Sequence, residues 1–263
     1  MSTFRPRSSL AITLSVWRAL FLREALARMF GRRAALVWLL LEPVVHLAFM
    51  VFVFAVLRVR HVGGIDTALW LMAGMLAFFM FRRVATQGAS AIGANLALFT
   101  YRQVKPVDTV LVRCLLEALL MLMISAIVLA GAALLDVPMH VESPLAVIAA
   151  VLGLWLLALG YSLCVSVVNE LSPEVGNIIG LLLLPLYLIS GVLFPLSSLP
   201  GPYREWVMLN PVAHGVEGVR EGLASYYHAA PELDLGYLYL CALVLLFLGL
   251  ALQVRNQHRL AAL

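Results

Sequence analysis

The chain has 263 residues, of which 63% are hydrophobic and 12% charged, and its mean hydropathy is +1.00. Soluble domains carry about 25% charged residues, and a soluble fold of this composition would expose large apolar patches. The formal charge of +4 comes from basic residues at the ends of apolar runs, which is typical of membrane topology and argues against nucleic acid as a partner. We therefore predict an all-α integral membrane protein, with one transmembrane domain over 1–263.

The first predicted element is a helix over 12–30. Its apolar residues can share one side while Arg18, Glu24 and Arg28 are polar, which predicts an amphipathic helix in the inner membrane interface. The residues expected on the apolar side are Ile12, Val16, Ala19, Leu20, Leu26 and Phe30. No short apolar stretch with a small-residue cleavage site follows the Arg-rich start, so we expect no cleaved signal peptide.

Six apolar runs are long enough, or nearly so, to cross a bilayer, which takes about 20 residues. The predicted spans are 37–57, 67–82, 109–135, 144–168, 177–194 and 235–254. Pro185 and Gly191 interrupt the fifth, so we expect a kink there.

The distribution of basic residues predicts that both termini are cytoplasmic. With that orientation, the outer connections hold only Arg58, Arg60, Arg204 and Arg220. The inner segments would hold Arg5, Arg7, Arg18, Arg23, Arg28, Arg32, Arg33, Arg82, Arg83, Arg102, Lys105, Arg255 and Arg259.

The inner connection after the second span carries a stripe of small residues at every fourth position, which suits close helix contact. The stripe consists of Ala85, Ala89, Gly93 and Ala97, and it predicts that the second span continues as a helix beyond the membrane. The segment 99–108 follows, where aromatic and charged residues occur together before and after Pro106.

The outer segment 195–234 contains several prolines, and a helical pattern resumes after Asn210-Pro211. Two short helices, dipping into the membrane and returning, fit this pattern better than an irregular loop. Val212, Val216, Val219 and Leu223 form the apolar face of the second helix, and Glu217, Arg220 and Glu221 are expected on the opposite face.

The chain lacks the motifs of the common catalytic sites. Lys105, the single lysine, has neither the glycines nor the Ser or Thr of a phosphate-binding loop, so any ATPase must be a separate protein. No metal-ligand spacing and no G-x-S-x-G site is present, and Cys114, Cys164 and Cys241 are read as small apolar residues. We expect neither enzyme activity nor a bound metal or cofactor.

Charged residues within the predicted spans have two readings that the sequence leaves open. Glu42 and the Arg113–Glu117 pair, four residues apart on one helix, are either structural or face a polar cavity. The residues that could line a substrate path are likewise either structural or exposed to such a cavity. Those residues are Trp70, Phe78, Arg82, Arg83, Tyr161 and Tyr187.

Several segments, in this order and spacing, resemble type-2 ABC export permeases, and most closely the capsular polysaccharide permeases of the KpsM type. At the entry to the first span they are Phe21-Leu-Arg-Glu-Ala-Leu-Ala-Arg28, Gly31, Trp38 and Leu41-Glu-Pro43. In the inner loop they are Asn95-Leu-Ala-Leu-Phe99 and Val104-Lys-Pro-Val-Asp-Thr109. Near the fifth span they are Pro185-Leu-Tyr187, Phe194-Pro195, Pro200 and Asn210-Pro-Val-Ala-His214.

This resemblance implies that the chain is a permease subunit, paired with a second copy and with two cytoplasmic ATPase subunits that bind ATP and Mg. It implies an interface helix that includes Arg23, Glu24 and Arg28. The implied coupling residues are Asn95, Phe99, Tyr101, Arg102, Lys105, Pro106 and Asp108. The implied outer gate residues are Pro200, Tyr203, Trp206, Asn210, Pro211, His214, Glu217 and Arg220.

The implied cargo is a lipid-linked, acidic capsular polysaccharide that leaves the bacterial inner membrane toward periplasmic and outer-membrane export proteins. The same architecture also serves exporters of O-antigen, teichoic acid, lipids or drugs. A proton-driven secondary transporter is a further alternative, but it needs carboxylates near mid-membrane, and Glu42 and Glu117 lie near the ends of their spans.

Overall fold

The structure is a computed structural model that describes residues 8–30, 35–57, 61–137, 139, 141–224 and 226–262. Gly31 and the basic residues Arg5, Arg7, Arg32, Arg33, Arg58 and Arg60, used above for the resemblance and the orientation, lie outside these ranges. The long helices are α1 (Ser9–Phe30), α2 (Ala35–Val56), α3 (Thr67–Ala89), α4 (Pro106–Leu134), α5 (Pro144–Leu171) and α10 (Leu235–Ala261). The shorter elements are β1 (His61–Val62), β2 (Ile65–Asp66), η1 (Gly93–Thr100), α6 (Pro173–Leu181), α7 (Leu183–Ile189), η2 (Leu196–Ser198), α8 (Gly201–Val207) and α9 (Pro211–Leu223).

The described residues are mostly helical, as predicted, and four helices are long and apolar enough to cross a membrane: α3, α4, α5 and α10. Two shorter apolar helical stretches, Leu41–Val56 and Pro173–Ile189, coincide with the first and fifth predicted spans. Helix α3 continues to Ala89, well beyond Arg82 and Arg83, as the small-residue stripe predicts.

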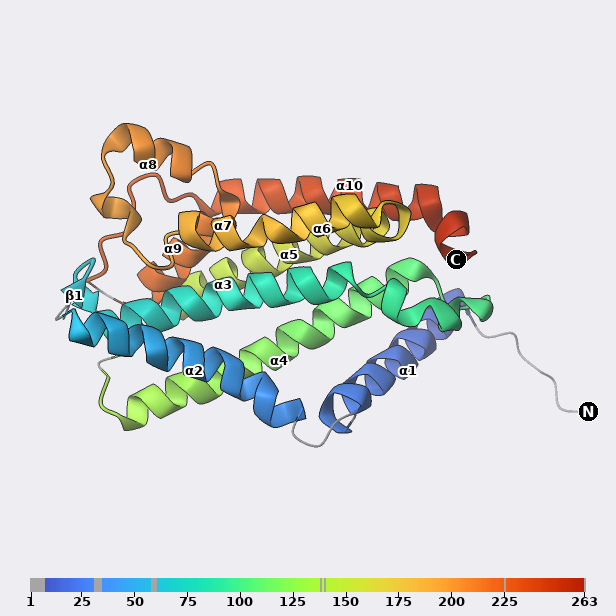
Figure 1. Cartoon of the computed structure of the whole chain (residues 1–263), viewed down its shortest axis with the longest axis horizontal. Helices are drawn as coiled ribbons and strands as arrows, with labels where there is room; N and C mark the ends of the chain where they lie inside the picture. The colour runs from blue at the N-terminus through green and yellow to red at the C-terminus, as the bar shows by residue number, and fades with distance from the viewer. Residues whose placement is uncertain are drawn as a thin grey trace, which may run out of the picture.

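Helix α3 lies at the centre of the bundle, and most of its residues are buried. Helices α5 and α10 pack side by side along their length (Figure 1). Two glycines permit this contact, because a Cβ at Gly160 would meet Leu246 N at 2.8 Å and one at Gly249 would meet Gly160 O at 3.1 Å.

The fifth apolar run is broken, as predicted, but the break lies at Leu182, between α6 and α7. Pro185 accounts for this position, because its ring nitrogen cannot donate to the carbonyl four residues earlier, at Leu181. Helix α7 then ends at Ile189, and Gly191 turns the chain with a φ of +70°.

A short hairpin between α2 and α3 is the one described sheet, and the sequence analysis did not predict it. Strands β1 and β2 pair His61 with Asp66 and Val62 with Ile65. The turn uses Gly63 and Gly64, which both have positive φ, as a tight two-residue hairpin requires. Asp66 then caps α3 by accepting a hydrogen bond from Ala68 N at 2.8 Å.

The passes of the chain alternate in direction, so two ends of the bundle can be distinguished (Figure 1). The start of α1, element η1 and the end of α10 gather at one end, and β1, α8 and α9 lie at the other (Figure 1). The predicted coupling segment 99–108 and the predicted outer segment 195–234 are therefore at opposite ends of the molecule.

Candidate functional site

Charged side chains from α1, α3 and α4 meet at the end of the bundle that holds η1. We call Glu24, Arg28, Arg83, Arg113 and Glu117 the inner charged cluster. Glu117 is fully buried, and its carboxylate lies 2.8 Å from Arg28 and 2.9 Å from Arg83. Arg113 lies 2.5 Å from Glu24 and 4.0 Å from Glu117. The cluster thus joins three helices by ion pairs around two buried carboxylates.

The predicted Arg113–Glu117 pair is present, but it is the longest ion pair of Glu117. The shorter partners come from other helices, because residues at i and i+4 share a face and that face is here packed against α1 and α3. Gln87 adds to the network by accepting hydrogen bonds from Arg28 at 2.5 Å and from Arg113 at 3.1 Å.

Asn95 connects the inner charged cluster to η1. Its side chain is buried, accepts a hydrogen bond from Arg23, and donates to Glu24 at 3.2 Å and to the Ala91 carbonyl at 2.8 Å. Phe99, the other predicted coupling residue in η1, is buried in the main core. Asn95 and Phe99 therefore hold η1 in place within this chain.

The turn from Tyr101 to Lys105 is the exposed part of the predicted coupling segment. Tyr101 is 64% exposed, and Arg102 and Lys105 are also exposed. Pro106 is buried and occupies the first turn of α4, where its missing N–H costs nothing. The turn thus presents one aromatic ring and two cations beyond the end of the bundle.

Asp108, a predicted contact of a partner protein, is buried in this chain, and its carboxylate is satisfied within it. One oxygen accepts from Lys105 N at 3.0 Å, which caps α4, and the other accepts from Trp17 Nε1 of α1 at 2.8 Å. Within this chain Asp108 positions the turn and docks α1, and its contact with a partner protein stays a prediction.

Helix α1 packs on α4 through Val16 and Leu20, which contact Val112, and the predicted apolar side is correct for these two residues. Leu26 was predicted on that side but is 54% exposed. Leu10, Leu14 and Leu22 are exposed as well, so α1 has a second apolar surface that this chain leaves uncovered.

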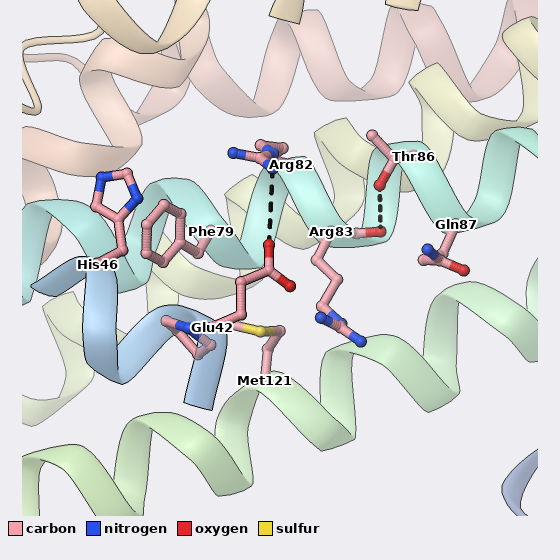
Figure 2. A pocket seen from close by; sticks show the side chains of 9 residues that line it. Glu42, His46, Phe79, Arg82, Arg83, Thr86, Gln87 and Met121 are labelled. Carbon is pink, nitrogen blue, oxygen red and sulfur yellow. Dashed lines mark hydrogen bonds and ion pairs between the residues drawn. The ribbon is translucent and has the colours of Figure 1, made fainter. Parts of the chain in front are cut away.

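A cavity of about 210 Å³, here called the lateral pocket, opens between α2, α3 and α4 beside the inner charged cluster (Figure 2). Arg82 and Glu42 point toward each other across it, 3.9 Å apart, while Arg83 points toward α4 (Figure 2). Two of the predicted path residues, Arg82 and Arg83, thus line a real cavity, and Glu42 faces it.

The other predicted path residues lie elsewhere. Tyr161 lines a second cavity, of about 390 Å³, between α3, α5 and α6. Tyr187 packs on Phe78 with ring centroids 5.0 Å apart, and its hydroxyl lies 3.4 Å from His46 Nε2. Trp70 and Phe78 are fully buried in the core of the single chain.

Glu217 and Arg220 of α9 form a fully buried ion pair of 3.1 Å at the opposite end, here called the outer buried pair. Arg220 also donates to the carbonyls of Gly191 at 2.7 Å and Val192 at 3.1 Å. Its guanidinium lies 3.9 Å from the ring centroid of Trp70. Both residues were predicted opposite the apolar residues of α9, and this second face is also covered, because these partners surround them inside the protein.

Tyr227 and the chain after it complete the environment of Glu217. The Tyr227 hydroxyl donates to Glu217 at 2.8 Å, and Ala230 N donates to the same carboxylate at 3.1 Å. Burial raises the pKa of the Tyr227 phenol, so it remains a donor. The outer buried pair therefore ties α9 to α3, to the end of α7 and to the segment before α10.

The remaining predicted gate residues are mainly structural in this chain. Asn210 caps α9 by accepting from Val212 N at 3.0 Å and donates to Ser190 Oγ at 2.8 Å, and Pro211 fills the first helical turn. His214 is buried between Met208 and Asp234. Pro200, Tyr203 and Trp206 are exposed at the end of the bundle, on and just before α8.

The whole-chain comparisons agree with this architecture. A family model described as ABC-2 type transporter matches residues 15–224. The chain belongs to the ABC-2 type transporter family. The match runs from α1 through α9 and so includes the inner charged cluster, the exposed turn and the outer buried pair.

Curated relatives align over nearly the full length. The polysialic acid transport protein KpsM of Escherichia coli is 34% identical over 246 residues, covering 94% of this chain and 95% of that protein. The capsule polysaccharide export inner-membrane protein CtrC of Neisseria meningitidis serogroup A is 29% identical, covering 94% of this chain and 93% of CtrC. BexB of Haemophilus influenzae, named likewise, is 28% identical, covering 95% and 94%.

Sequence reasoning missed several residues that the structure brings into these sites. Trp17 bonds Asp108 and Gln87 bonds Arg113, both from other helices, and Tyr227 bonds Glu217 ten residues earlier. Glu42 and His46, four residues apart and therefore on one helix face, both line the lateral pocket, although nothing in the sequence indicated a cavity there. The described residues contain no cluster of His, Cys, Asp or Glu that could hold a metal ion.

Proposed function

We propose that this chain is the transmembrane subunit of an ABC exporter that moves a lipid-linked, acidic capsular polysaccharide across the bacterial inner membrane. Membership of the ABC-2 family makes it a transporter component, and relatives named for capsule polysaccharide or polysialic acid support the cargo class. ATP and Mg would be bound by a separate ATPase, since the sequence has no phosphate-binding loop.

In this proposal six segments span the membrane: α2, α3, α4, α5, α6 with α7, and α10. Their alternating direction in Figure 1 and the basic residues near η1 and the end of α10 support cytoplasmic termini. Helix α1 would lie in the inner interface, where its exposed leucines meet lipid. The segment 195–234, with α8 and α9, would form the re-entrant outer element.

The exposed turn from Tyr101 to Lys105 is the proposed contact that couples the ATPase to this chain. Two ATPase subunits would seat on this turn in two permease copies, and closure of the ATPase dimer on ATP would displace it. Because Asp108 and Asn95 fix the turn to α1 and α4, the displacement would move those helices as a unit. The inner charged cluster would pass the motion to α3.

The cargo would travel between the two copies toward periplasmic and outer-membrane export proteins. Arg82, Arg83, Tyr161 and Tyr187 are the proposed contacts that remain accessible in the single chain. Trp70 and Phe78 would reach cargo only if helices separate, because the single chain buries both.

Affinity purification of the tagged chain from its native membrane in mild detergent, followed by mass spectrometry and an ATPase assay, tests this function. We expect a stoichiometric P-loop ATPase to co-purify, and the charge-reversal variant R102E/K105E to lose it. R255E/R259E is the matched control, because both arginines are exposed on α10 at the same end of the bundle.

Retention of the ATPase in R102E/K105E would move the coupling contact elsewhere. A preparation that transports cargo with no ATPase present would overturn the proposed function itself.

A further inference from the structure

The lateral pocket lies beside more arginines than its carboxylates can neutralise. Glu24 and Glu117 together serve Arg23, Arg28, Arg83 and Arg113, with pairs between 2.5 and 4.0 Å. Arg82 faces Glu42 at 3.9 Å, a separation at the limit of an ion pair, and the two side chains are 47% and 67% exposed. Five arginines and three glutamates therefore leave an excess of two positive charges here.

Such an excess is costly next to lipid, because charges are poorly screened there and favour a bound counter-charge. Arg28, Arg83 and Arg113 are 11 to 22% exposed and are held in ion pairs of 2.5 to 2.9 Å, so a ligand would have to compete with those pairs. Arg82 is different: it lies on the wall of the cavity, pairs weakly and keeps free donors. Arg82 is the group that can supply new hydrogen bonds.

The shape of the pocket determines where a ligand can enter. Helix α2 lies beside α3 near β1 and diverges from it toward its own start, which leaves a gap over α4 (Figure 1). The pocket lies in this gap, and Figure 2 shows Arg82, Thr86 and Gln87 following one another along α3 at its wall. On α2 the neighbouring Leu41, Val45 and Phe49 are exposed and apolar.

From these observations we infer that the lateral pocket binds the phosphate-bearing head of an anionic lipid, which enters sideways from the bilayer. Arg82 supplies charge-assisted hydrogen bonds to the phosphate, and Thr86 and Gln87 supply neutral polar contacts nearby. The acyl part lies along the exposed apolar residues of α2. Glu42 opposes binding, since it is the carboxylate on the pocket wall.

This inference rests on the proposed function in taking the η1 end of the bundle to be the inner leaflet. It goes further by naming a site within one chain for an anionic lipid head. Two sources carry this chemistry, a resident phospholipid and the lipid end of the cargo, and both present a phosphate to Arg82.

Native mass spectrometry of the purified full chain in neutral detergent, titrated with phosphatidylglycerol and separately with phosphatidylcholine, tests the site. We expect preferential binding of phosphatidylglycerol. We expect R82A to weaken it about tenfold, the factor for loss of one charge-assisted hydrogen bond, and E42Q to strengthen it. R255A is the matched control, because Arg255 is exposed and lies outside the pocket.

Three results would overturn the inference: no preference for the anionic lipid, an equal loss in R82A and R255A, or displacement of the lipid by millimolar inorganic phosphate. The last would mean a site for free anions. E42Q is the control for misfolding, because it breaks the same ion pair as R82A. It is expected to strengthen lipid binding, whereas R82A weakens it.

Export by R82A in cells distinguishes the two lipid sources. Reduced export together with reduced phosphatidylglycerol binding assigns the site to the cargo, while normal export with lost binding assigns it to a resident lipid. Either result is independent of the ATPase co-purification, so failure here leaves the proposed function standing.

Discussion

The inner charged cluster and the outer buried pair use the same residue types in opposite ways. The inner cluster joins side chains from three helices, carries excess positive charge and borders a cavity. The outer buried pair lies on one helix, is charge-balanced and is fully enclosed. Arg220 donates to the backbone carbonyls of Gly191 and Val192, which can move only if the main chain moves. The inner site can exchange partners, whereas the outer site fixes a frame.

Burial alone therefore does not define the role of an ion pair. A buried pair is weak evidence for stability in itself, but removal of one partner leaves an unpaired charge, which is strongly destabilising. At the outer site nothing mobile can replace a lost partner. At the inner site Gln87 accepts hydrogen bonds from Arg28 and Arg113, and Arg113 pairs with two carboxylates, Glu24 and Glu117.

Replacement of Arg220 by leucine is expected to have the largest effect on stability. Glu217 would remain buried without its cation, at a cost of about 3–5 kcal/mol, and the carbonyls of Gly191 and Val192 would lose their donors. Thermal unfolding followed by size-exclusion chromatography in detergent would report this as loss of most folded protein.

Two variants control that measurement. Glu221→Gln lies next to Arg220 on the same helix but is exposed, so its effect should be within about 0.5 kcal/mol. The double variant E217L/R220L should be more stable than R220L alone, because it leaves no unpaired charge. If R220L melts like the wild type, the outer buried pair does not fix the outer segment.

Replacement of Glu117 by glutamine is expected to cost less, about 1–3 kcal/mol, although Glu117 is equally buried. Arg83 and Arg113 are 19% and 11% exposed, and glutamine still accepts one hydrogen bond. Destabilisation should diminish as chloride is raised, because these partly exposed arginines can recruit anions. Equal losses in E117Q and R220L, both insensitive to salt, would remove the distinction between the two sites.

Helix boundaries follow well from the sequence because capping residues act locally: Pro106, Pro144, Pro173 and Pro211 each occupy the first turn of a helix. Partners between helices do not follow, since a helical pattern identifies a face but not what covers it. Arg113 pairs with Glu24, which is 89 residues away in the sequence. Arg220 donates to the Trp70 carbonyl, which is 150 residues away. For this reason the sequence indicated the Arg113–Glu117 pair but not the partners that bury Glu217 and Arg220.

Acidification should destabilise the outer segment through His214. Its Nδ1 accepts from Asp234 N at 2.9 Å and its Nε2 lies 2.7 Å from Met208 O, so a second ring proton would break the first bond. Burial lowers the pKa of His214 below its usual 6.5. The unfolded chain therefore takes up the proton first, and stability that is complete above pH 6.5 falls as the pH drops below it.

For one proton, the free energy of unfolding can fall by at most about 1.4 kcal/mol per pH unit. Melting temperatures between pH 7.5 and 5 measure it. His214→Asn should flatten this dependence, since its amide oxygen can still accept from Asp234 N, while His258→Asn on exposed α10 should not. An unchanged pH profile in the His214 variant would assign the acid sensitivity to other groups.

The smallest effect is expected for Trp17→Phe, which keeps an apolar aromatic side chain and removes the hydrogen bond to Asp108. One such bond contributes about 1 kcal/mol, so global melting should change little. Hydrogen exchange should nevertheless increase in α1 and in the turn from Tyr101 to Lys105, because Asp108 holds both. Trp38→Phe on exposed α2 is the matched control. Faster exchange confined to α1 would mean that the inner end consists of two independent parts, and that the exposed turn moves without α1.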